Sequence, residues 1–295
     1  MNFNGKRARP IPNQEVFDFI QSKVNSSYLY HDTIVDEYLK TYYEWIKSSK
    51  LNNFHGLDKF NSLGFAHGTS QTFDFFYAEN KDRRMRCFKG DFIYHELSWR
   101  NNYPNWKYIE DDGLMSNDAV VISLPFSDTG NKHRDMEDVL DWCDTLGIPV
   151  FIDAAYYSIA RNLEIDLTRP CIHTVAFSMS KAFHGTHRLR IGMRCKKENI
   201  DDPVDFFNEI EMVSKISAGV GMEICDNFTT DYNQDKYREK QILLCEDLNI
   251  QPSDSVVFGI ADKTHPDFGN YDRGTDSRRV CISNLLSDRT GADNE

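Results

Sequence analysis

A lysine surrounded by hydroxyl and guanidinium groups is the first feature of the sequence that could perform chemistry. Lys181 lies in the segment FSMSKAFHGTHRLRIGMR, just after the end of the apolar run HTVAFS. Ser178 and Ser180 supply hydroxyl groups, and Arg188 and Arg190 supply planar guanidinium groups that suit a phosphate. A lysine at the end of a buried strand can pair with a carboxylate, bind a phosphate or act as a nucleophile. These neighbours favour an amine placed beside a phosphate site.

An amine beside a phosphate site is typical of a Schiff base between lysine and pyridoxal 5'-phosphate. This cofactor hypothesis requires backbone N–H groups at the start of a helix, because such groups bind phosphate well. Gly68, Thr69 and Ser70 lie just before a predicted helix and meet this requirement. The sequence therefore offers a second, distant segment for the same phosphate.

The pyridine ring of this cofactor makes further demands on the chain. Its nitrogen needs a carboxylate, because a protonated ring is the better electron sink, and Asp153 lies at the end of the apolar run in IPVFIDAAY. A buried acid there also needs a cationic partner. Tyr156 lies three residues further on and could donate a hydrogen bond to the phenolic oxygen of the ring. Trp99, after the strand-like DFIYHEL, is a candidate to stack on the ring.

The order of these motifs carries a resemblance to a known family. Gly-Thr-Ser, Trp, Asp-x-x-Tyr, Ser-x-Ser-Lys and Arg-x-Gly follow one another as in the fold-type I pyridoxal-phosphate enzymes, and SMSK followed by RIG is similar to the signature of the class I/II aminotransferases. The resemblance covers residues 65–195 well and the C-terminal part weakly. It implies pyridoxal 5'-phosphate as the cofactor and a homodimer with its active site near the subunit interface.

The resemblance also implies a role for each matching residue. Lys181 would form the internal aldimine and later move the proton of the substrate α-carbon, while Asp153 would pair with the pyridinium and Tyr156 would contact the phenolic oxygen. The remaining implied contacts are Gly68, Thr69, Ser70, Ser178, Ser180 and Arg190 at the phosphate, Trp99 on the ring face, and Arg279 of SRRVCIS at the substrate carboxylate, with Arg278 as the neighbouring alternative.

The sequence departs from the family pattern at two places. The family usually has Asn-Pro-x-Asn-Pro-Thr-Gly, whereas this chain has Leu-Pro-Phe-Ser-Asp-Thr-Gly, so that Ser127 takes the place of the second asparagine. Ser127 is still expected to contact the cofactor, with a different reach. The spacing from Lys181 to Arg190 is one residue longer than the family's, which leaves Arg188 as an alternative phosphate ligand.

Several reactions are compatible with these residues. The default is transamination between an amino acid and an oxo acid, both small molecules. A lyase, decarboxylase or cyclase that acts on an amino acid with the same cofactor is the alternative, because the motifs do not fix the substrate pocket. A non-catalytic protein that keeps the fold for binding is a further alternative, although both Lys181 and Asp153 are present.

A different class of enzyme shares part of the lysine motif. Ser178-Met179-Ser180-Lys181 also satisfies the S-x-x-K pattern of serine acyl-transfer enzymes, in which the serine is the nucleophile and the lysine its base. Those enzymes need a downstream Lys-Thr-Gly, and the nearest match is Lys263-Thr264-His265. The sequence therefore favours the cofactor hypothesis over acyl transfer.

Alternating strands and helices must position these side chains. DAVVISLP, IPVFIDAAY, HTVAFS and LRIGMRC read as buried strands, and MEDVLDWCDTLG reads as an amphipathic helix that stops at Gly147. Such alternation favours an α/β fold with a partly parallel sheet. With the resemblance, we expect an aspartate-aminotransferase-like architecture, in which a three-layer large domain with a mostly parallel mixed sheet is joined to a small α+β domain.

The remaining segments complete the expected domains. We predict two helices within 14–48, a helix at QTFDFFYAEN, strands around a turn in RMRCFKGDFIYHEL, one long helix from 203 to 225, a helix at DKYREKQILLCEDL, and strands at SVVFGIAD and RRVCIS. Residues 50–200 are expected to form the large cofactor-binding domain. Residues 1–49 and 201–295 are expected to form the small domain together.

Composition excludes several other classes of function. The formal net charge of −12 argues against broad binding to nucleic acid, which needs a basic face. The apolar runs are too short to span a membrane, and the polar N-terminal stretch lacks the apolar core of a signal peptide. The seven cysteines form no CxxC pair, and the histidines show no metal-ligand spacing. We therefore expect a cytoplasmic protein with reduced thiols and without a metal site.

Overall fold

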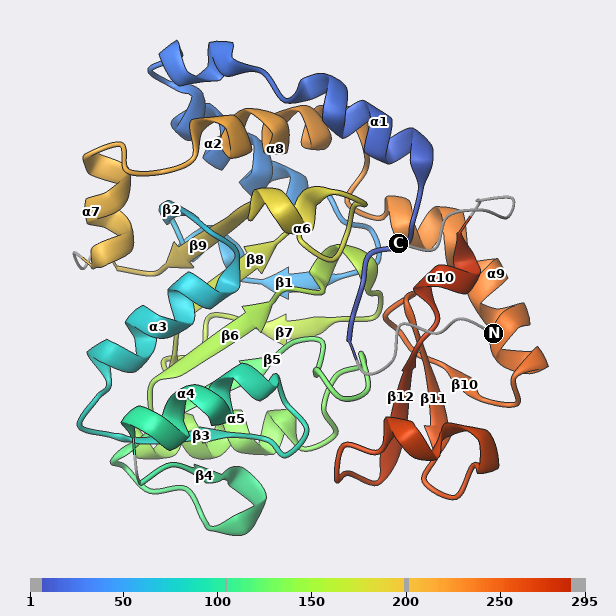
Figure 1. Cartoon of the computed structure of the whole chain (residues 1–295). Helices are drawn as coiled ribbons and strands as arrows, with labels where there is room; N and C mark the ends of the chain where they lie inside the picture. The colour runs from blue at the N-terminus through green and yellow to red at the C-terminus, as the bar shows by residue number, and fades with distance from the viewer. Residues whose placement is uncertain (1–6, 104, 199–201, 288–295) are drawn as a thin grey trace.

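A seven-stranded sheet forms the centre of the computed structural model, which describes residues 7–103, 105–198 and 202–287 (Figure 1). Neighbouring strands of the sheet are parallel except β9, which runs antiparallel to both β2 and β8. This arrangement confirms the predicted α/β class with a mostly parallel mixed sheet. The strand order is β2 (Ser62–Ala66), β9 (Gly192–Lys196), β8 (Ile172–Ser178), β6 (Val150–Ala154), β5 (Asp118–Ser123), β3 (Arg84–Cys87) and β4 (Lys107–Tyr108).

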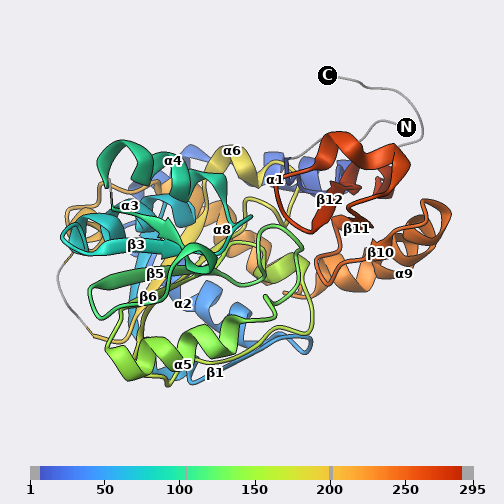
Figure 2. The ribbon, with the colours of Figure 1, turned by 90° about the horizontal axis from the view of Figure 1, so that it is seen from below.

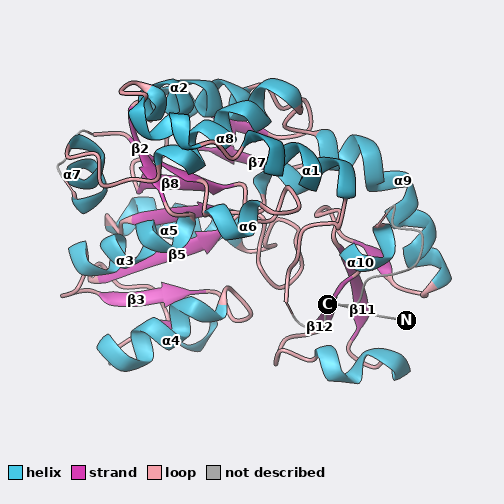
Figure 3. Cartoon of the chain, turned by 45° about the horizontal axis from the view of Figure 1, so that its top comes forward, coloured by secondary structure: helices cyan, strands magenta, loops and turns pink. Residues whose placement is uncertain are grey.

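Both faces of this sheet are covered by helices, which explains why its central strands are apolar throughout. Val120 and Ile122 of β5 belong to the apolar cluster that also contains buried residues of α2 (Ile34–Lys47) and α5 (Met136–Leu146). Ala119 and Val121 alternate with them and face a second cluster with α3 (Thr69–Glu79) and α4 (Ile93–Asn102). Figure 3 shows the strands as the middle layer between these helices.

Helices from both ends of the chain pack together on one side of the sheet. α1 (Gln14–Lys23) and α2 contact α8 (Lys215–Asn227), and Tyr38 of α2 donates a hydrogen bond to the carbonyl of Gly192 at 3.1 Å (Figure 1). The two predicted N-terminal helices are thus confirmed, and they lie against the large sheet. The predicted division into 50–200 and 1–49 with 201–295 stays a prediction.

Two predicted segments differ from the structure. Only RMRC of the segment RMRCFKGDFIYHEL is a strand, and residues 93–99 belong to helix α4. The single helix predicted from 203 to 225 is two helices, α7 (Pro203–Glu209) and α8. The chain breaks between them because Glu211 has a positive φ of 58°, and the side chain of Ser214 then caps α8 by accepting a hydrogen bond from Ser217 N–H.

The C-terminal part forms a separate, three-stranded antiparallel sheet beside the large one (Figure 2). No helix in the described ranges has the length and apolar character needed to cross a membrane. The elements of this part and the remaining short elements are α9 (Tyr232–Asp247), β10 (Gln251–Pro252), β11 (Phe258–Asp262), β12 (Ser277–Cys281), α10 (Ser283–Leu286), β1 (Asn53–His55), β7 (Glu164–Asp166) and α6 (Thr186–Leu189).

Candidate active site

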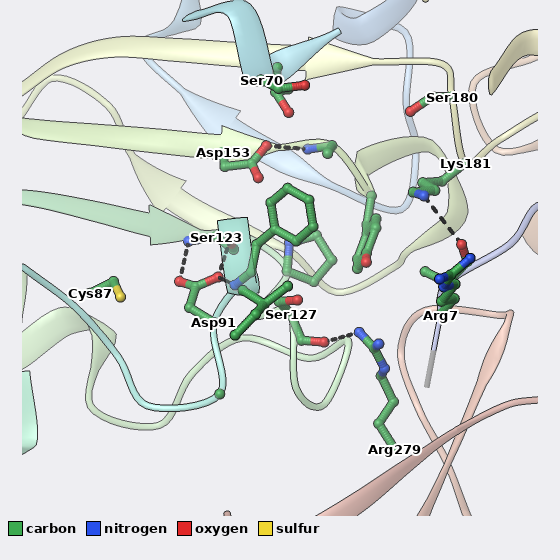
Figure 4. Close-up of a pocket in the computed structure, with 18 of the residues that line it drawn as sticks. Arg7, Ser70, Cys87, Asp91, Ser123, Ser127, Asp153, Ser180, Lys181 and Arg279 are labelled. Carbon is green, nitrogen blue, oxygen red and sulfur yellow. Dashed lines mark hydrogen bonds between the residues drawn. The ribbon is translucent and has the colours of Figure 1, made fainter. Parts of the chain in front are cut away.

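A cavity of about 690 Å³ lies where strands β5, β6 and β8 end at their carboxyl sides (Figure 4). Ligands of open α/β sheets generally bind at this edge. The cavity brings together most of the side chains that the sequence analysis selected from distant segments. Its walls include Thr69, Ser70, Ser127, Asp153, Tyr156, Ser180, Lys181, Arg190 and Arg279.

Lys181 enters the cavity from the turn after β8. Its Nζ atom donates a hydrogen bond to the carbonyl of Ala8, at 3.2 Å (Figure 4). Burial lowers the pKa of this amine to about 8, and the positive charges of Arg9 and Arg190 act in the same direction. A larger share of Lys181 is therefore neutral, and able to attack a carbonyl carbon, than for an ordinary lysine.

Asp153 lies at the end of β6 and is 5% exposed. One carboxylate oxygen accepts a hydrogen bond from the N–H of Ala155 at 3.0 Å, and no described residue forms a salt bridge with it. Burial raises the pKa of Asp153 to about 7, and the nearby Asp91 raises it further in the same direction. A buried carboxyl group in this state gains stability if a cation is placed beside it.

A second carboxyl group accompanies Asp153. Asp91 accepts hydrogen bonds from the N–H of Phe92 at 2.7 Å and from the hydroxyl of Ser123. Ser123 is the strand neighbour of Asp153 in the β5–β6 pair. Burial raises the pKa of Asp91 to about 6. Sequence reasoning missed Asp91 and Ser123, because nothing in one sequence shows that the turn after β3 folds toward the end of β5.

The start of α3 and Arg190 form a cradle of phosphate size. Arg190 donates through Nη2 to the hydroxyl of Ser70 at 2.7 Å and to the carbonyl of His67 at 2.9 Å. Gly68 has a φ of +73°, and a Cβ atom there would lie 2.7 Å from Arg190 Nη2. Glycine is thus required for the close approach of the guanidinium to the helix start.

The hydroxyl groups of the lysine motif lie beside this cradle. Ser178 donates to Ser180 at 2.9 Å, and its oxygen would lie 3.5 Å from a Cβ atom on Gly68. Arg188, in contrast, is exposed and does not line the cavity. Of the two arginines left open by the spacing, Arg190 is therefore the one that lies at the cradle. Arg190 itself has a left-handed backbone conformation, with φ 57°.

Arg279 forms the opposite wall, on strand β12. It is 4% exposed, its guanidinium lies 4.4 Å from the ring centroid of Phe258, and it donates to the carbonyl of Ser127. The ring of Tyr156 packs edge-on against the same phenylalanine. Arg278 instead donates to the carbonyl of His265 at 2.7 Å and does not line the cavity.

Trp99 does not lie where the sequence analysis expected it. It is 0% exposed, does not line the cavity, and packs against Tyr77, His95 and Trp106. Because DFIYHEL leads into a helix and not a strand, the tryptophan is turned into the second apolar cluster. Phe92, at the N-terminus of α4, lines the cavity with 40% of its surface exposed and is an aromatic side chain that could cover a ring there.

No protein-family model and no curated relative matches the chain. Several solved structures, in contrast, are similar to the chain. A PLP-bound C-S lyase from Staphylococcus hominis is similar with a TM-score of 0.66 at 12% identity, over 96% of this chain and 87% of that one. A PLP-bound putative aminotransferase from Clostridium difficile 630 has a TM-score of 0.66 at 11% identity, over 92% and 84%.

A histidinol-phosphate aminotransferase from Clostridium acetobutylicum has a TM-score of 0.61 at 12% identity, over 94% of this chain and 93% of that one. The similarity to all three extends over nearly the whole chain, at identities that establish the fold alone. The chain therefore has the fold of the fold-type I, aminotransferase-like pyridoxal-phosphate enzymes.

Proposed function

We propose that the protein is a pyridoxal-phosphate-dependent enzyme that acts on an amino acid, with transamination to an oxo acid as its reaction. The observation that carries this proposal is the joint presence, in one cavity, of the Lys181 amine, the buried Asp153 carboxyl group and the Arg190 cradle. The three come from segments far apart in sequence. The PLP-bound state of two structural neighbours supports the same cofactor.

The residues of the cavity fit this cofactor in type and burial. Asp153 has no cationic partner among the described residues and would pair with a protonated pyridine nitrogen. The start of α3 with Arg190 would hold the phosphate, and Tyr156 and Ser127 would face the phenolic oxygen. Phe92 would cover one face of the ring. When bound, pyridoxal phosphate supplies an aldehyde that condenses with amines and a ring that accepts the electrons of a bond at the α-carbon.

The chain's own groups would then direct the substrate. Arg279 would bind the α-carboxylate of the substrate, because a guanidinium group suits the geometry of a carboxylate. Lys181, with its lowered pKa, can take a proton at the α-carbon and return it at another atom. Asp91 and Asp153, each 5% exposed, would form the buried floor beside the ring nitrogen.

A lyase with the same cofactor is the second candidate. A C-S lyase has a TM-score as high as that of the putative aminotransferase, and the turn at Ser127 differs from the usual aminotransferase turn. Both reactions begin with the same proton removal by Lys181. The difference lies in the fate of the substrate side chain, and the experiment below separates them.

The test begins with cofactor uptake. Purified protein mixed with pyridoxal phosphate should gain the visible absorption of a lysine-bound cofactor, and borohydride should fix that cofactor on Lys181, as read by peptide mass spectrometry. Lys181→Ala should lose both signals, whereas Lys40→Ala, at an exposed lysine of α2, should keep them. A protein that takes up no cofactor contradicts the proposal.

Incubation with single amino acids then identifies the reaction. Conversion of the bound cofactor to its pyridoxamine form supports transamination. Release of ammonia and an oxo acid with the original absorption restored supports the lyase. We also propose a cytoplasmic homodimer with the predicted two-domain division, which light scattering and limited proteolysis would test.

A further inference from the structure

The cavity is rich in positive charge although the chain has a net charge of −12. Six cationic side chains line it, against three carboxylic acids. Three of the cations have a task in the proposed function, at the cofactor aldehyde, the phosphate and the α-carboxylate. The six are Arg7, Arg9, Lys181, Arg190, Arg273 and Arg279, and the acids are Asp91, Glu96 and Asp153.

A fourth cation, Arg273, is occupied within the protein. Its Nη1 atom lies 3.4 Å from a carboxylate oxygen of Asp128, and its guanidinium also donates to the carbonyls of Gly90, Asp91 and Ser127 at 3.2–3.3 Å. These contacts tie the loop of Arg273 to the two turns at the cavity floor. Arg273 therefore has a structural role, which leaves Arg7 and Arg9.

Arg7 and Arg9 lie next to the reacting amine. They flank Ala8, whose carbonyl accepts the hydrogen bond of Lys181 Nζ. Arg9 is the largest charge contribution to the lowered pKa of Lys181, ahead of Arg190 and Arg279. Figure 4 shows Arg7 on the same side of the cavity as Lys181, across from Asp91 and Asp153.

No acid in the described part of the chain forms a salt bridge with these two arginines. Within residues 7–103, 105–198 and 202–287, neither Arg7 nor Arg9 forms a salt bridge or a side-chain hydrogen bond. Of the three acids in the cavity, Asp91 and Asp153 are buried at the floor. Glu96 is paired with Arg100 and accepts a hydrogen bond from Tyr108 at 2.6 Å. The positive charge at the mouth is thus left for a ligand.

We propose that Arg7 and Arg9 bind an anionic group on the side chain of the substrate, so that the enzyme takes amino acids with an acidic side chain. This inference rests on the proposed function. With the α-amine at Lys181 and the α-carboxylate at Arg279, the side chain is the remaining part of the substrate that can reach the N-terminal segment. A carboxylate and a phosphate share the required chemistry, since guanidinium groups bind both.

Binding of unreactive anions tests the subsite without any turnover. Glutarate and pentanoate have the same chain length and differ in one carboxylate. Affinities are measured for the cofactor-loaded protein by the change in cofactor absorption, and for the cofactor-free protein by thermal shift. Glutarate should bind at least about tenfold more tightly than pentanoate, as a charge-assisted contact to guanidinium predicts. 3-Phosphonopropionate in place of glutarate shows whether phosphonate or carboxylate fits better.

The double variant Arg7→Gln/Arg9→Gln should lose this preference and keep its affinity for pentanoate. Arg188→Gln removes an exposed arginine outside the cavity and should change neither affinity. The single variant Arg9→Gln should lose part of the preference and also raise the pKa of Lys181. Equal binding of glutarate and pentanoate to the wild type, or an unchanged preference in the double variant, would overturn the inference.

The amino-acid half-reaction provides an independent result. Glutamate should convert the bound cofactor with a KM at least about tenfold below that of the isosteric glutamine, and the double variant should equalise the two. Failure of cofactor uptake contradicts the proposed function and leaves the glutarate measurement on the cofactor-free protein to decide the subsite. A loaded enzyme that prefers glutamine contradicts the subsite alone.

Discussion

Two buried aspartates on neighbouring strands have opposite surroundings. Asp118 begins β5 and is 0% exposed, and its carboxylate accepts hydrogen bonds from Arg84 Nε at 2.6 Å and Arg86 Nη1 at 2.7 Å. Asp153 lies near the end of β6, at the other edge of the sheet, and is 5% exposed. Its carboxylate accepts one N–H from Ala155 and forms no salt bridge within the described residues.

The difference separates a structural charge from a charge prepared for a ligand. At Asp118 the folded chain itself supplies the counter-charges, so nothing needs to bind there. At Asp153 the described residues supply burial without a salt bridge, and burial together with the charge of Asp91 raises the carboxyl pKa to about 7, although the more distant Lys181 acts against this rise. Titratable groups perturbed in this way and facing a cavity are typical of functional sites.

Removing the structural charge should have the largest effect on stability. Asp118→Ala leaves two guanidinium groups without their buried partner, and such a break costs about 3–5 kcal/mol of unfolding free energy. Urea unfolding followed by circular dichroism measures this loss. Cofactor uptake at low temperature should stay normal, because Asp118 lies at the opposite edge of the sheet. Loss of uptake in the folded variant would contradict the division of roles.

Asp153→Ala should show the reverse pattern. Activity of the loaded enzyme should fall by about 10²–10³-fold, the usual effect of losing one preorganised electrostatic partner. Stability of the cofactor-free protein should not fall, because the variant removes a buried carboxyl group without a salt-bridge partner. A loss of unfolding free energy as large as that of Asp118→Ala would show that Asp153 has a structural partner after all.

The same contrast appears in the pH dependence of the cofactor-free protein. The carboxyl group of Asp153 has its ordinary pKa of 3.8 when unfolded and about 7 when folded. Between these values the folded state binds the extra proton, so stability is lost as the pH rises from about 4 to about 7. The expected slope from this group is about 1.4 kcal/mol per pH unit.

The pKa of Asp91 is also raised, to about 6, and therefore also makes stability fall as the pH rises. The contribution of Asp153 is for this reason measured as the difference between the wild type and a variant that lacks its carboxyl group. Urea titrations of the wild type and of Asp153→Asn at several pH values should differ by the slope assigned to Asp153. Parallel curves for the two proteins would contradict the raised pKa. Bound cofactor should also flatten the slope, since a cation beside Asp153 favours the carboxylate.

The sequence indicated which residues the strand ends would bring to one cavity, while their roles there stay predictions. Asp153 and Lys181 each follow a short apolar run, and parallel strands bring such positions to one edge of a sheet. Gly68 to Ser70 could be placed in the same way, at the start of a helix. The α/β class followed from the alternation of strands and helices after residue 118.

The remaining differences arose where tertiary packing decides the local structure. The apolar and aromatic residues of IYHELSW are compatible with either a strand or a helix. The segment forms a helix, and this places Trp99 in the second apolar cluster against Tyr77. The break near Glu211 could not be predicted, because residues 204–218 contain neither glycine nor proline to mark it. Arg7 and Arg9 lie outside any regular element, so no periodicity could place them at the cavity.

The comparison extends to two lysines at the carboxyl ends of neighbouring strands, Lys181 after β8 and Lys196 as the last residue of β9. Lys196 of β9 has its Nζ atom 3.1 Å from a carboxylate oxygen of Asp202, whereas Lys181 donates to a backbone carbonyl. Lys196 is 5% exposed and tied to this carboxylate, whereas the amine of Lys181 lines the cavity and, with a pKa of about 8, releases its proton more readily than an ordinary lysine. Pyridoxal phosphate followed by borohydride should therefore modify Lys181 and leave Lys196 unmodified.

The rate of that modification should follow the neutral fraction of Lys181. Below pH 8 the rate should fall about tenfold for each pH unit, and above pH 8 it should level off. In Arg9→Gln the point at which it levels off should move to higher pH, because the positive charge that contributes most to the lowered pKa of Lys181 is gone. A rate that keeps rising to pH 10 in the wild type would show that Lys181 is an ordinary lysine, and that the cavity prepares the carboxyl group of Asp153 but not the amine opposite it.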